Sequence, residues 1–537
     1  MLIDCYPPED VFARVPELAE QTDPVLRQLN HLLDDDRLFE QVRGDLVRRY
    51  RLTAVHGRHS TPVEVVLRLF VVQHLYAWSY AETVQRVADS LVLRWFCRVY
   101  FARVPDATTL LRWAQTIQEE TLQALNERVV VLAYQASATR ARKLRIDSTC
   151  VQSPIHAPTD SGLLGDSVRV LTRLLRQAKP YVQATLAATG TNVQALSRRL
   201  FRNRLRMVRR ALQQLHRMRR HLGAPPDQEP TVTAKSERQR ALYQTLLHAA
   251  RCTVRQAEQM CALLTSASAP PQRQRSAGHD QGEGRGEGRG EGRGEATNAS
   301  DRPDQFERQE ERHRRRILAH LEQTLPLVRQ VIRQARQRVI AGQQVPATEK
   351  IVSLFEPQTR VIPRHKGGAA VEFGRQVMLD EVDGGMLTRA HILADGESEH
   401  HQALPAVQHH RQLFGRSPKL VAGDRGLHAA GVEAQLQAVG VSQVAIPWTG
   451  RVGEARRAHE HERSWRRRYR WRAGIEGRIH VLRRDYGLRR ARSHGMTGLA
   501  RDIGWGIVAH NLHQIAVHQA VHRHTKRTKR TKNRSMA

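Results

Sequence analysis

The sequence is poor in cysteine, has no long hydrophobic run and contains far fewer acidic than basic residues. Its five cysteines are odd in number, widely scattered and never in a C-x-x-C arrangement. That pattern excludes a disulfide framework or a zinc finger and favours a reducing compartment. No stretch of about 18 apolar residues occurs, so neither a membrane-spanning helix nor a membrane partner is expected.

Two further absences narrow the class of protein. The N-terminus carries Asp4, Glu9 and Asp10, where a secretion signal has a basic segment followed by an apolar one. No G-x-x-x-x-G-K-[ST] loop is present, so the use of ATP is not expected. We therefore predict a soluble, cytoplasmic protein.

The shortage of acidic residues leaves a large positive charge. Lys and Arg number 86 against 53 Asp and Glu, which gives a net charge of +33 and a pI near 11.1. Arginine binds phosphate in a bidentate manner, and each neutralised phosphate releases counterions, so this charge favours a polyanionic partner. DNA or RNA is the expected partner, and the simplest alternative class is a ribosomal or RNA-coating protein.

Residues 1–135 are predicted to form an all-α N-terminal domain. Apolar residues recur there at helical spacing, and Ser79 is a candidate N-cap for a helix that begins at Tyr80. A second unit, VPDATTLLRWAQTI, offers Asp106 or Thr108 as its N-cap. Paired short helices of this kind are typical of a helix-turn-helix-like DNA-binding region, and an ordinary helical subdomain is the open alternative.

The segment KLRIDSTCV is predicted to be a strand of an α/β core whose first part covers 136–168. In that strand Ile146 lies on one face, and Asp147 lies on the other with Arg145 and Thr149. Asp147 is near the end of the strand, before a turn rich in Ser, Thr and Pro. Folds of the α/β class place functional side chains at such positions.

A long helical insertion is predicted at 169–342. The apolar residues of 318–339 alternate steps of three and four, as an a/d seam does, and Pro326 is expected to kink that helix or restart it. A Gly/Glu/Arg repeat at about 270–305 is too polar to bury a core and is predicted to be a disordered linker. The helices either mediate assembly of a dimer or larger complex or pack only on themselves.

Residues 343–520 return to an α/β rhythm. Two alternating apolar runs joined by the turn DGG at 383–385 predict a hairpin. KLVAGDRG then predicts a short strand that ends at Asp424, followed by a helix and the strand VSQVAIP. The final residues, 521–537, are interpreted as a basic tail.

The stretch YRWRAGIEGRIHVLRR, at 469–484, carries one glutamate among many arginines. At about 100° per residue in an α-helix, four of its side chains share an arc of about 60°; they are Tyr469, Arg472, Glu476 and Arg483. A carboxylate flanked by guanidinium groups can ligate a cation while its neighbours hold phosphate oxygens. The alternative is an ion pair between Arg472 and Glu476 worth about 0.3–0.5 kcal/mol.

Asp147 and Asp424 at strand ends, together with Glu476 on a helix, supply oxygen ligands for a two-metal phosphoryl-transfer site. Hard cations such as Mg²⁺ prefer oxygen ligands. Two such ions about 3.5–4 Å apart activate an attacking oxygen and stabilise the leaving one. Four basic residues follow the stripe, namely Arg489, Arg490, Arg492 and His494. We interpret them as an extension of its phosphate-binding surface, and a solvated basic loop is the alternative.

Other acidic and histidine clusters are interpreted differently. Rivals of Asp424 around the hairpin are Asp380, Asp395, Glu397 and Glu399. Asp160 and Asp166 are expected in a turn and a helix cap. The histidines at 400/401, 409/410 and 510/513 have no cysteine at ligand spacing, so they are expected on the surface or at DNA and not around zinc.

The spacing Tyr469-x2-Arg472-x3-Glu476-x6-Arg483 resembles the Tyr-Arg-Glu-Lys signature of DDE transposases of bacterial insertion sequences, with Arg in place of Lys. RIDST and VAGDRG resemble the two aspartate motifs of the same group. SYAETVQRVADSLVLRWFCR and VPDATTLLRW are similar to the N-terminal domain of many of these enzymes. The resemblance covers 1–168 and 345–515, while the stretch of sequence between Asp147 and Asp424 is long for this group.

The resemblance implies an α/β protein in which a helical insertion interrupts an RNase H-like core with a mixed sheet. It implies Mg²⁺ (or Mn²⁺), hydrolytic nicking at element ends and strand transfer by the exposed 3′-OH. The metal-binding and catalytic residues would be Asp147, Asp424 and Glu476. The DNA-binding residues would be Tyr469, Arg472, Arg483, Arg489 and Arg490.

The expected partners are double-stranded DNA, as terminal inverted repeats and as target, and a second copy of the chain in a homodimer or larger synaptic complex at the bacterial nucleoid. One alternative is an inactive or domesticated DNA-binding relative, which missing carboxylates would indicate, although all three are present. Another is a recombinase with a tyrosine nucleophile. Its expected histidine-hydrophobic-histidine pairs are absent.

Overall fold

The computed structural model describes the backbone at 2–6, 23–48, 60–188, 200–220, 232–266, 301–363 and 371–535. Contacts divide the chain into two units. One, here called the sheet unit, comprises Met1–Pro154 and Ile362–Ala537, and the other, the helical unit, comprises Ile155–Val361. The helical unit is thus wider than the insertion predicted at 169–342. Most of the linker predicted at about 270–305 lies outside the described residues.

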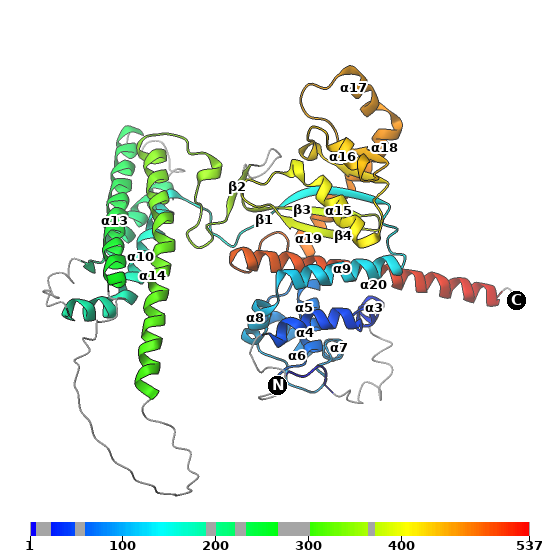
Figure 1. Cartoon of the computed structure of the whole chain (residues 1–537), viewed down its shortest axis with the longest axis horizontal. Helices are drawn as coiled ribbons and strands as arrows, with labels where there is room; N and C mark the ends of the chain where they lie inside the picture. The colour runs from blue at the N-terminus through cyan, green and yellow to red at the C-terminus, as the bar shows by residue number, and fades with distance from the viewer. Residues whose placement is uncertain are drawn as a thin grey trace, which may run out of the picture. The chain divides into compact units, whose positions relative to one another are not determined.

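A mixed sheet organises the sheet unit, as predicted (Figure 1). Its strands are β1 (Lys143–Gln152), β2 (Arg360–Pro363), β3 (Val371–Val382), β4 (Met386–Ile392), β5 (Leu420–Gly423) and β6 (Gln443–Ala445). The order is β2-β3-β1-β5-β6, with β4 also paired to β3. β1 runs antiparallel to β3 and parallel to β5, and β6 runs parallel to β5.

The hairpin predicted from the turn DGG is confirmed. β3 and β4 pair antiparallel, and Gly384 and Gly385 between them adopt φ of 88° and 81°, values that favour glycine. Asp383 begins the turn, and its carboxylate accepts hydrogen bonds from the backbone N–H groups of Arg142 and Lys143 at the start of β1. The turn therefore fixes β1 and β3 in register.

Helices cover both faces of the sheet. Leu144 and Ile146 of β1 pack with α15 (Ala403–Phe414) and α16 (Val432–Ala438) on one face. On the other face, Val151 packs with α19 (Gly474–Asp485) and α20 (Gly495–Ser535). The predicted alternation along β1 is confirmed, and it directs Asp147 toward the face that carries α18 (Arg463–Arg472) and α19. The short helix α17 (Glu454–His461) precedes α18.

The N-terminal helices share the core of the sheet unit. They are α3 (Pro24–Leu32), α4 (Asp36–Val47), α5 (Val63–Leu75), α6 (Tyr80–Asp89), α7 (Leu91–Phe96), α8 (Ala107–Thr116) and α9 (Glu119–Gln135). The N-cap predicted at Ser79 is confirmed, since Ser79 forms a capping box with Glu82. Of the two candidates Asp106 and Thr108, the N-cap is Asp106, which accepts from Thr108 and Thr109. One continuous cluster of buried apolar side chains joins these helices to β1, α15 and α20.

Arg68 is a fully buried arginine at the centre of the N-terminal helices. Its guanidinium donates to Asp34 Oδ1 at 2.7 Å, to Asn30 Oδ1 at 2.7 Å and to the Phe96 carbonyl at 3.1 Å. It also contacts Glu64 Oε1 at 3.3 Å. Because these partners come from α3, the turn after it, α5 and α7, this one side chain ties four segments together.

The helical unit is a bundle of long helices with its own core (Figure 1). The helices are α10 (Asp160–Ala188), α12 (Leu205–Arg220), α13 (Val232–Ser266) and α14 (Asp301–Ala335). The seam predicted on α14 faces inward, since Leu321, Leu325 and Val328 are buried in this core. The helix also continues through Pro326, so the predicted restart is wrong. Packing of Leu325 and Val328 on the neighbouring helices holds that segment.

Candidate functional site

The site begins at the ends of two parallel strands. Ile146 of β1 is paired with Gly423 of β5, and this is their last pair in register. The next residues are Asp147 and Asp424, so the register carries the two aspartates to neighbouring positions on strands about 4.8 Å apart. The sequence pattern predicted that both would lie at strand ends, and the parallel pairing brings those ends together.

Burial and nearby negative charge both act on the Asp147 carboxyl. Asp147 is buried, and that burial, together with the negative charges of Asp424 and Glu476, raises the pKa of Asp147 to about 6. A hydrogen bond from the Ser148 N–H at 2.8 Å and the charge of Arg472 oppose this rise. Asp147 therefore lies within electrostatic range of two acidic side chains from distant parts of the sequence.

Arg472 lies between two of the carboxylates. Its Nη1 donates to Asp147 Oδ2 at 3.1 Å, and its Nη2 donates to Glu476 Oε1 at 2.7 Å. The same guanidinium lies over the ring of Tyr469, 5.6 Å from its centroid. The ion pair between Arg472 and Glu476, which was the alternative to a cation-binding role for Glu476, is present, and the same guanidinium also reaches Asp147 on the sheet. One cationic group thus occupies the space between a buried aspartate and a half-exposed glutamate.

The segment predicted as one helix is divided into α18 and α19 at Ala473. Arg145 of β1 explains the break, because its Nη1 donates to the Trp471 carbonyl at 2.8 Å and takes an acceptor that a continuous helix would use. Gly474 makes room for this contact, since a Cβ there would lie 2.2 Å from Arg145 Nη1. The break preserves the Arg472 to Glu476 contact across it.

Glu399 is a fourth carboxylate beside Asp424. A Cβ placed on Gly426 would lie 2.4 Å from Glu399 Oε2 and 3.1 Å from Asp424 Oδ1, so the two carboxylates border the same small space. Gln376 Nε2 donates to Glu399 Oε1 and to Ser148 Oγ. Burial, and to a lesser extent the charge of Asp424, raises the pKa of Glu399.

The sequence offered Glu399 and three other acidic residues as alternatives to Asp424 for the role of metal ligand. In the structure those three form ion pairs away from the site. Asp380 Oδ2 accepts from Arg389 at 2.6 Å, Asp395 Oδ1 accepts from Arg375 at 2.5 Å, and Glu397 Oε1 contacts His391 at 2.8 Å. Asp160 and Asp166 likewise pair with Arg338 and Arg169 within the helical unit. Of these four acidic residues, Glu399 is the one whose carboxylate lies beside Asp424. No local sequence pattern distinguished it from the other three.

The basic residues of the predicted DNA surface have different surroundings. Arg483 Nη2 donates to the buried Glu372 Oε1 at 3.0 Å. Arg489 and Arg490 are exposed on the segment that follows α19, where the Arg489 carbonyl accepts from Gln152 N at the end of β1. Arg492, by contrast, donates to the Ala77 and Trp78 carbonyls and anchors this segment to the N-terminal helices.

The prediction that the histidine pairs lie on the surface is partly wrong. His410 and His510 are buried. His510 Nε2 accepts from Arg478 Nη1 at 3.0 Å, and burial and the Arg478 charge lower the pKa of His510 to about 3. His409 contacts Glu127 at 3.1 Å. Buried neutral imidazoles with protein partners serve packing and not zinc binding.

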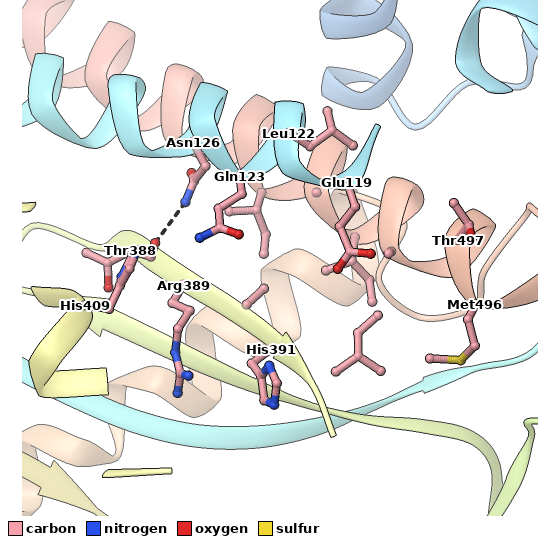
Figure 2. A pocket seen from close by; sticks show the side chains of 16 residues that line it. Glu119, Leu122, Gln123, Asn126, Thr388, Arg389, His391, His409, Met496 and Thr497 are labelled. Atoms are coloured by element: carbon pink, nitrogen blue, oxygen red, sulfur yellow. Dashed lines mark hydrogen bonds between the residues drawn. The ribbon is translucent and has the colours of Figure 1, made fainter. Parts of the chain in front are cut away.

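A large cavity of the sheet unit contains none of these carboxylates. It encloses about 470 Å³ between α9, β4 and α20, and its walls include Gln123, His391 and Met496 (Figure 2). Asn126 closes one side by donating to the Thr388 carbonyl at 3.1 Å. The carboxylates at the strand ends are therefore separate from this cavity.

Neither a preformed metal cage nor a transmembrane helix is found in the described part of the chain. Over those residues, no three His, Cys, Asp or Glu side chains are close enough to hold an ion. Within the same ranges, no helix has both the length and the apolar composition that crossing a bilayer requires.

Comparison with known families connects the N-terminal helices to transposases. Residues 14–116 match the model of a family described as "Transposase domain (DUF772)", which covers about a fifth of the chain. The match includes α3 to α8 and supports a transposase family. It ends before Asp147. No curated protein and no solved structure matches the chain.

Proposed function

We propose that the chain is a DDE transposase of a bacterial insertion sequence that binds the ends of its element and catalyses strand cleavage and 3′-OH strand transfer. The observation that carries this proposal is the parallel pairing of β1 and β5, whose last pair immediately precedes Asp147 and Asp424, with Glu476 joined to Asp147 through Arg472. The transposase-domain match supports the DNA-processing class. The mixed sheet supports an RNase H-like core.

The donor set fits Mg²⁺ or Mn²⁺. All the side chains proposed as ligands offer carboxylate oxygens, which hard cations prefer. Burial, and then the negative charges of Asp424 and Glu476, raise the pKa of Asp147, so a nearby positive charge would stabilise its ionised form. Arg472 supplies positive charge at this place, so its guanidinium stands in for a cation. Gly426 provides a further indication, because a side chain there would fill the space between Asp424 and Glu399.

The chemistry proposed for the site is phosphoryl transfer between DNA strands. Bound divalent ions would activate the attacking oxygen and stabilise the leaving one. Water first attacks the phosphodiester at the element end, the bond to O3′ breaks, and a 3′-OH is released. That 3′-OH then attacks a target phosphodiester and displaces the target's own 3′-oxygen.

The arginines of the site would position the DNA. Arg472 would exchange its carboxylate partners for a phosphate when ions occupy the site, because its fork of N–H donors matches both anions. The ring of Tyr469 holds the Arg472 guanidinium in place through a cation–π contact. Arg489 and Arg490, exposed beside the end of β1, would contact the backbone of the same duplex.

A cleavage and joining assay tests the proposal. DNA flanking the gene is first searched for short inverted repeats, and a supercoiled plasmid carrying them is incubated with the purified chain and Mg²⁺ or Mn²⁺. We expect nicks at the repeat ends and joined products, both of which EDTA removes. Equal nicking in EDTA, or intact ends under every metal condition, would contradict a metal-dependent transposase.

Replacing Gly426 by Ala is expected to reduce the rate of cleavage about tenfold while the fold persists. The added methyl would displace Glu399 Oε2 and the Asp424 carboxylate, and displacements below about 1 Å at reacting groups have effects of this order. Gly453→Ala is the matched control, since nothing lies within 4 Å of a Cβ there. Unchanged cleavage by Gly426→Ala would show that the space beside Asp424 is not used.

A further inference from the structure

Four arginines line a groove on the helical unit. The groove encloses about 330 Å³ between α13 and α14. Its walls are Arg251, Val254, Arg255, Glu258, Arg329, Ile332 and Arg333. On each helix the two arginines are four residues apart, so both rows point toward the same space. Val254 is buried and Ile332 half-buried beneath them, which gives the groove an apolar floor.

Packing of the bundle does not account for these arginines. The apolar faces of α13 and α14 are already buried in the core of the helical unit. Like charges at i and i+4 destabilise an isolated helix by about 0.2–0.5 kcal/mol per pair, so each row opposes the helix that carries it. A repeated unfavourable arrangement around one hollow suggests that an anion compensates it.

Acidic side chains of the protein neutralise little of the positive charge of these four arginines. Glu258 Oε1 accepts from Arg329 Nη2 at 2.6 Å. Over the described residues, Arg251, Arg255 and Arg333 form no ion pair with an acidic side chain. Elsewhere in the same unit arginines do have such partners, for example Arg315 with Glu311 at 2.6 Å. The groove therefore brings together four arginines, of which Arg329 alone has an acidic partner among the described residues.

We propose that this groove binds the phosphate backbone of duplex DNA; that the polyanion is DNA rests on the proposed function. Arginines four residues apart are separated by about 6 Å along a helix, and phosphates of one strand rise about 3.4 Å apart, so the length of each row equals about two phosphate steps along the duplex axis. Packed helices are about 8–10 Å apart, too close to admit a duplex. The groove thus receives the backbone ridge and recognises no base sequence.

Binding of a labelled 20-base-pair duplex of arbitrary sequence to the full chain, measured by fluorescence anisotropy in EDTA, tests the groove. For Arg251→Gln combined with Arg255→Gln we expect Kd to rise about tenfold at 0.15 M salt and the salt dependence of log K to lose about 2 from its slope. The matched control, Arg169→Gln with Arg315→Gln, removes the same charge from arginines that already have carboxylate partners. It is expected to change Kd less than about twofold.

A variant that is expected to tighten DNA binding distinguishes an effect on the groove from a loss of affinity through misfolding. Glu258→Gln frees Arg329 and removes a repulsive charge, so it should lower Kd about threefold and steepen the salt dependence by about 1. Equal losses in the two double variants, or weaker binding by Glu258→Gln, would overturn the groove in favour of general charge attraction. Tighter groove-dependent binding of single-stranded RNA of the same length would overturn the assignment to duplex DNA.

The outcomes separate this inference from the proposed function. Binding in EDTA requires no cleavage, so a chain that never cuts DNA can still lose affinity through the groove variants. In that case the transposase proposal fails and the groove stands. Conversely, metal-dependent cleavage at saturating DNA with unaltered affinity in Arg251→Gln/Arg255→Gln would remove the groove and leave the transposase proposal intact.

Discussion

Replacing Asp147 by Asn is expected to lower the rate of metal-dependent cleavage at least about 10³-fold. Bound metal ions stabilise such a transition state by several kcal/mol, and a tenfold change in rate corresponds to about 1.4 kcal/mol. Asp424→Asn and Glu476→Gln should have comparable effects, because the proposed site draws its oxygen ligands from all three carboxylates. The measurement is the initial rate of nicking on DNA that carries the element ends.

DNA affinity separates loss of chemistry from loss of substrate. Each of the three variants removes negative charge, so binding of the end duplex should be unchanged or slightly tighter. Asp485→Asn serves as the matched control, since Asp485 pairs with the adjacent Arg484 at 2.6 Å near the end of the same helix as Glu476. Cleavage at the normal rate in any of the three variants would remove that carboxylate from the proposed site.

The strand ends of the site were predictable from sequence because they depend on local pattern. A period of two along KLRIDSTCV determines the face of Asp147, and a short apolar run before a polar turn locates Asp424. Their adjacency depends on which strands pair. The whole helical unit lies between β1 and β5 in the sequence, so their parallel pairing is a tertiary fact that no local signal contains.

The surroundings of the stripe were less predictable for a similar reason. Helical spacing placed Tyr469, Arg472 and Glu476 together, and their contacts agree with it. The break at Ala473 comes from Arg145, whose guanidinium belongs to a strand far earlier in the chain. Arg483, predicted to bind phosphate, pairs with Glu372. The partner of a long side chain depends on which groups the tertiary fold brings within its reach, and local spacing does not determine this.

Sequence analysis did not predict the arginine-lined groove of the helical unit, because it considered only the apolar residues of these helices. Sequence analysis of α14 followed its apolar steps, and the structure places those residues in the bundle's own core. This favours the self-packed alternative for the helices and leaves their arginine faces as the surface to be explained. A search for unpaired like charges at i and i+4 would have identified Arg251 and Arg255, whereas their convergence with Arg329 required the packing.

Replacing Arg68 by Met is expected to reduce the local free energy of unfolding of the N-terminal helices by about 3 kcal/mol or more, since removal of one partner from a buried ionic network typically has effects of this size. Burial lowers the pKa of Arg68, a sign of the desolvation that its four partners offset. Methionine fills the volume but leaves Asn30 Oδ1 and the Phe96 carbonyl without their donor. Native-state hydrogen exchange of the α5 amides measures the change within this one region.

Arg43→Met is the control for Arg68→Met, because Arg43 and its partner Asp4 are both more than one-third exposed and such pairs contribute about 0–1 kcal/mol. If the α5 amides are equally protected in the two variants, the buried network does not stabilise these helices. A large loss in Arg68→Met alone would mean that the region matching the transposase domain is held together by ionic contacts inside its core.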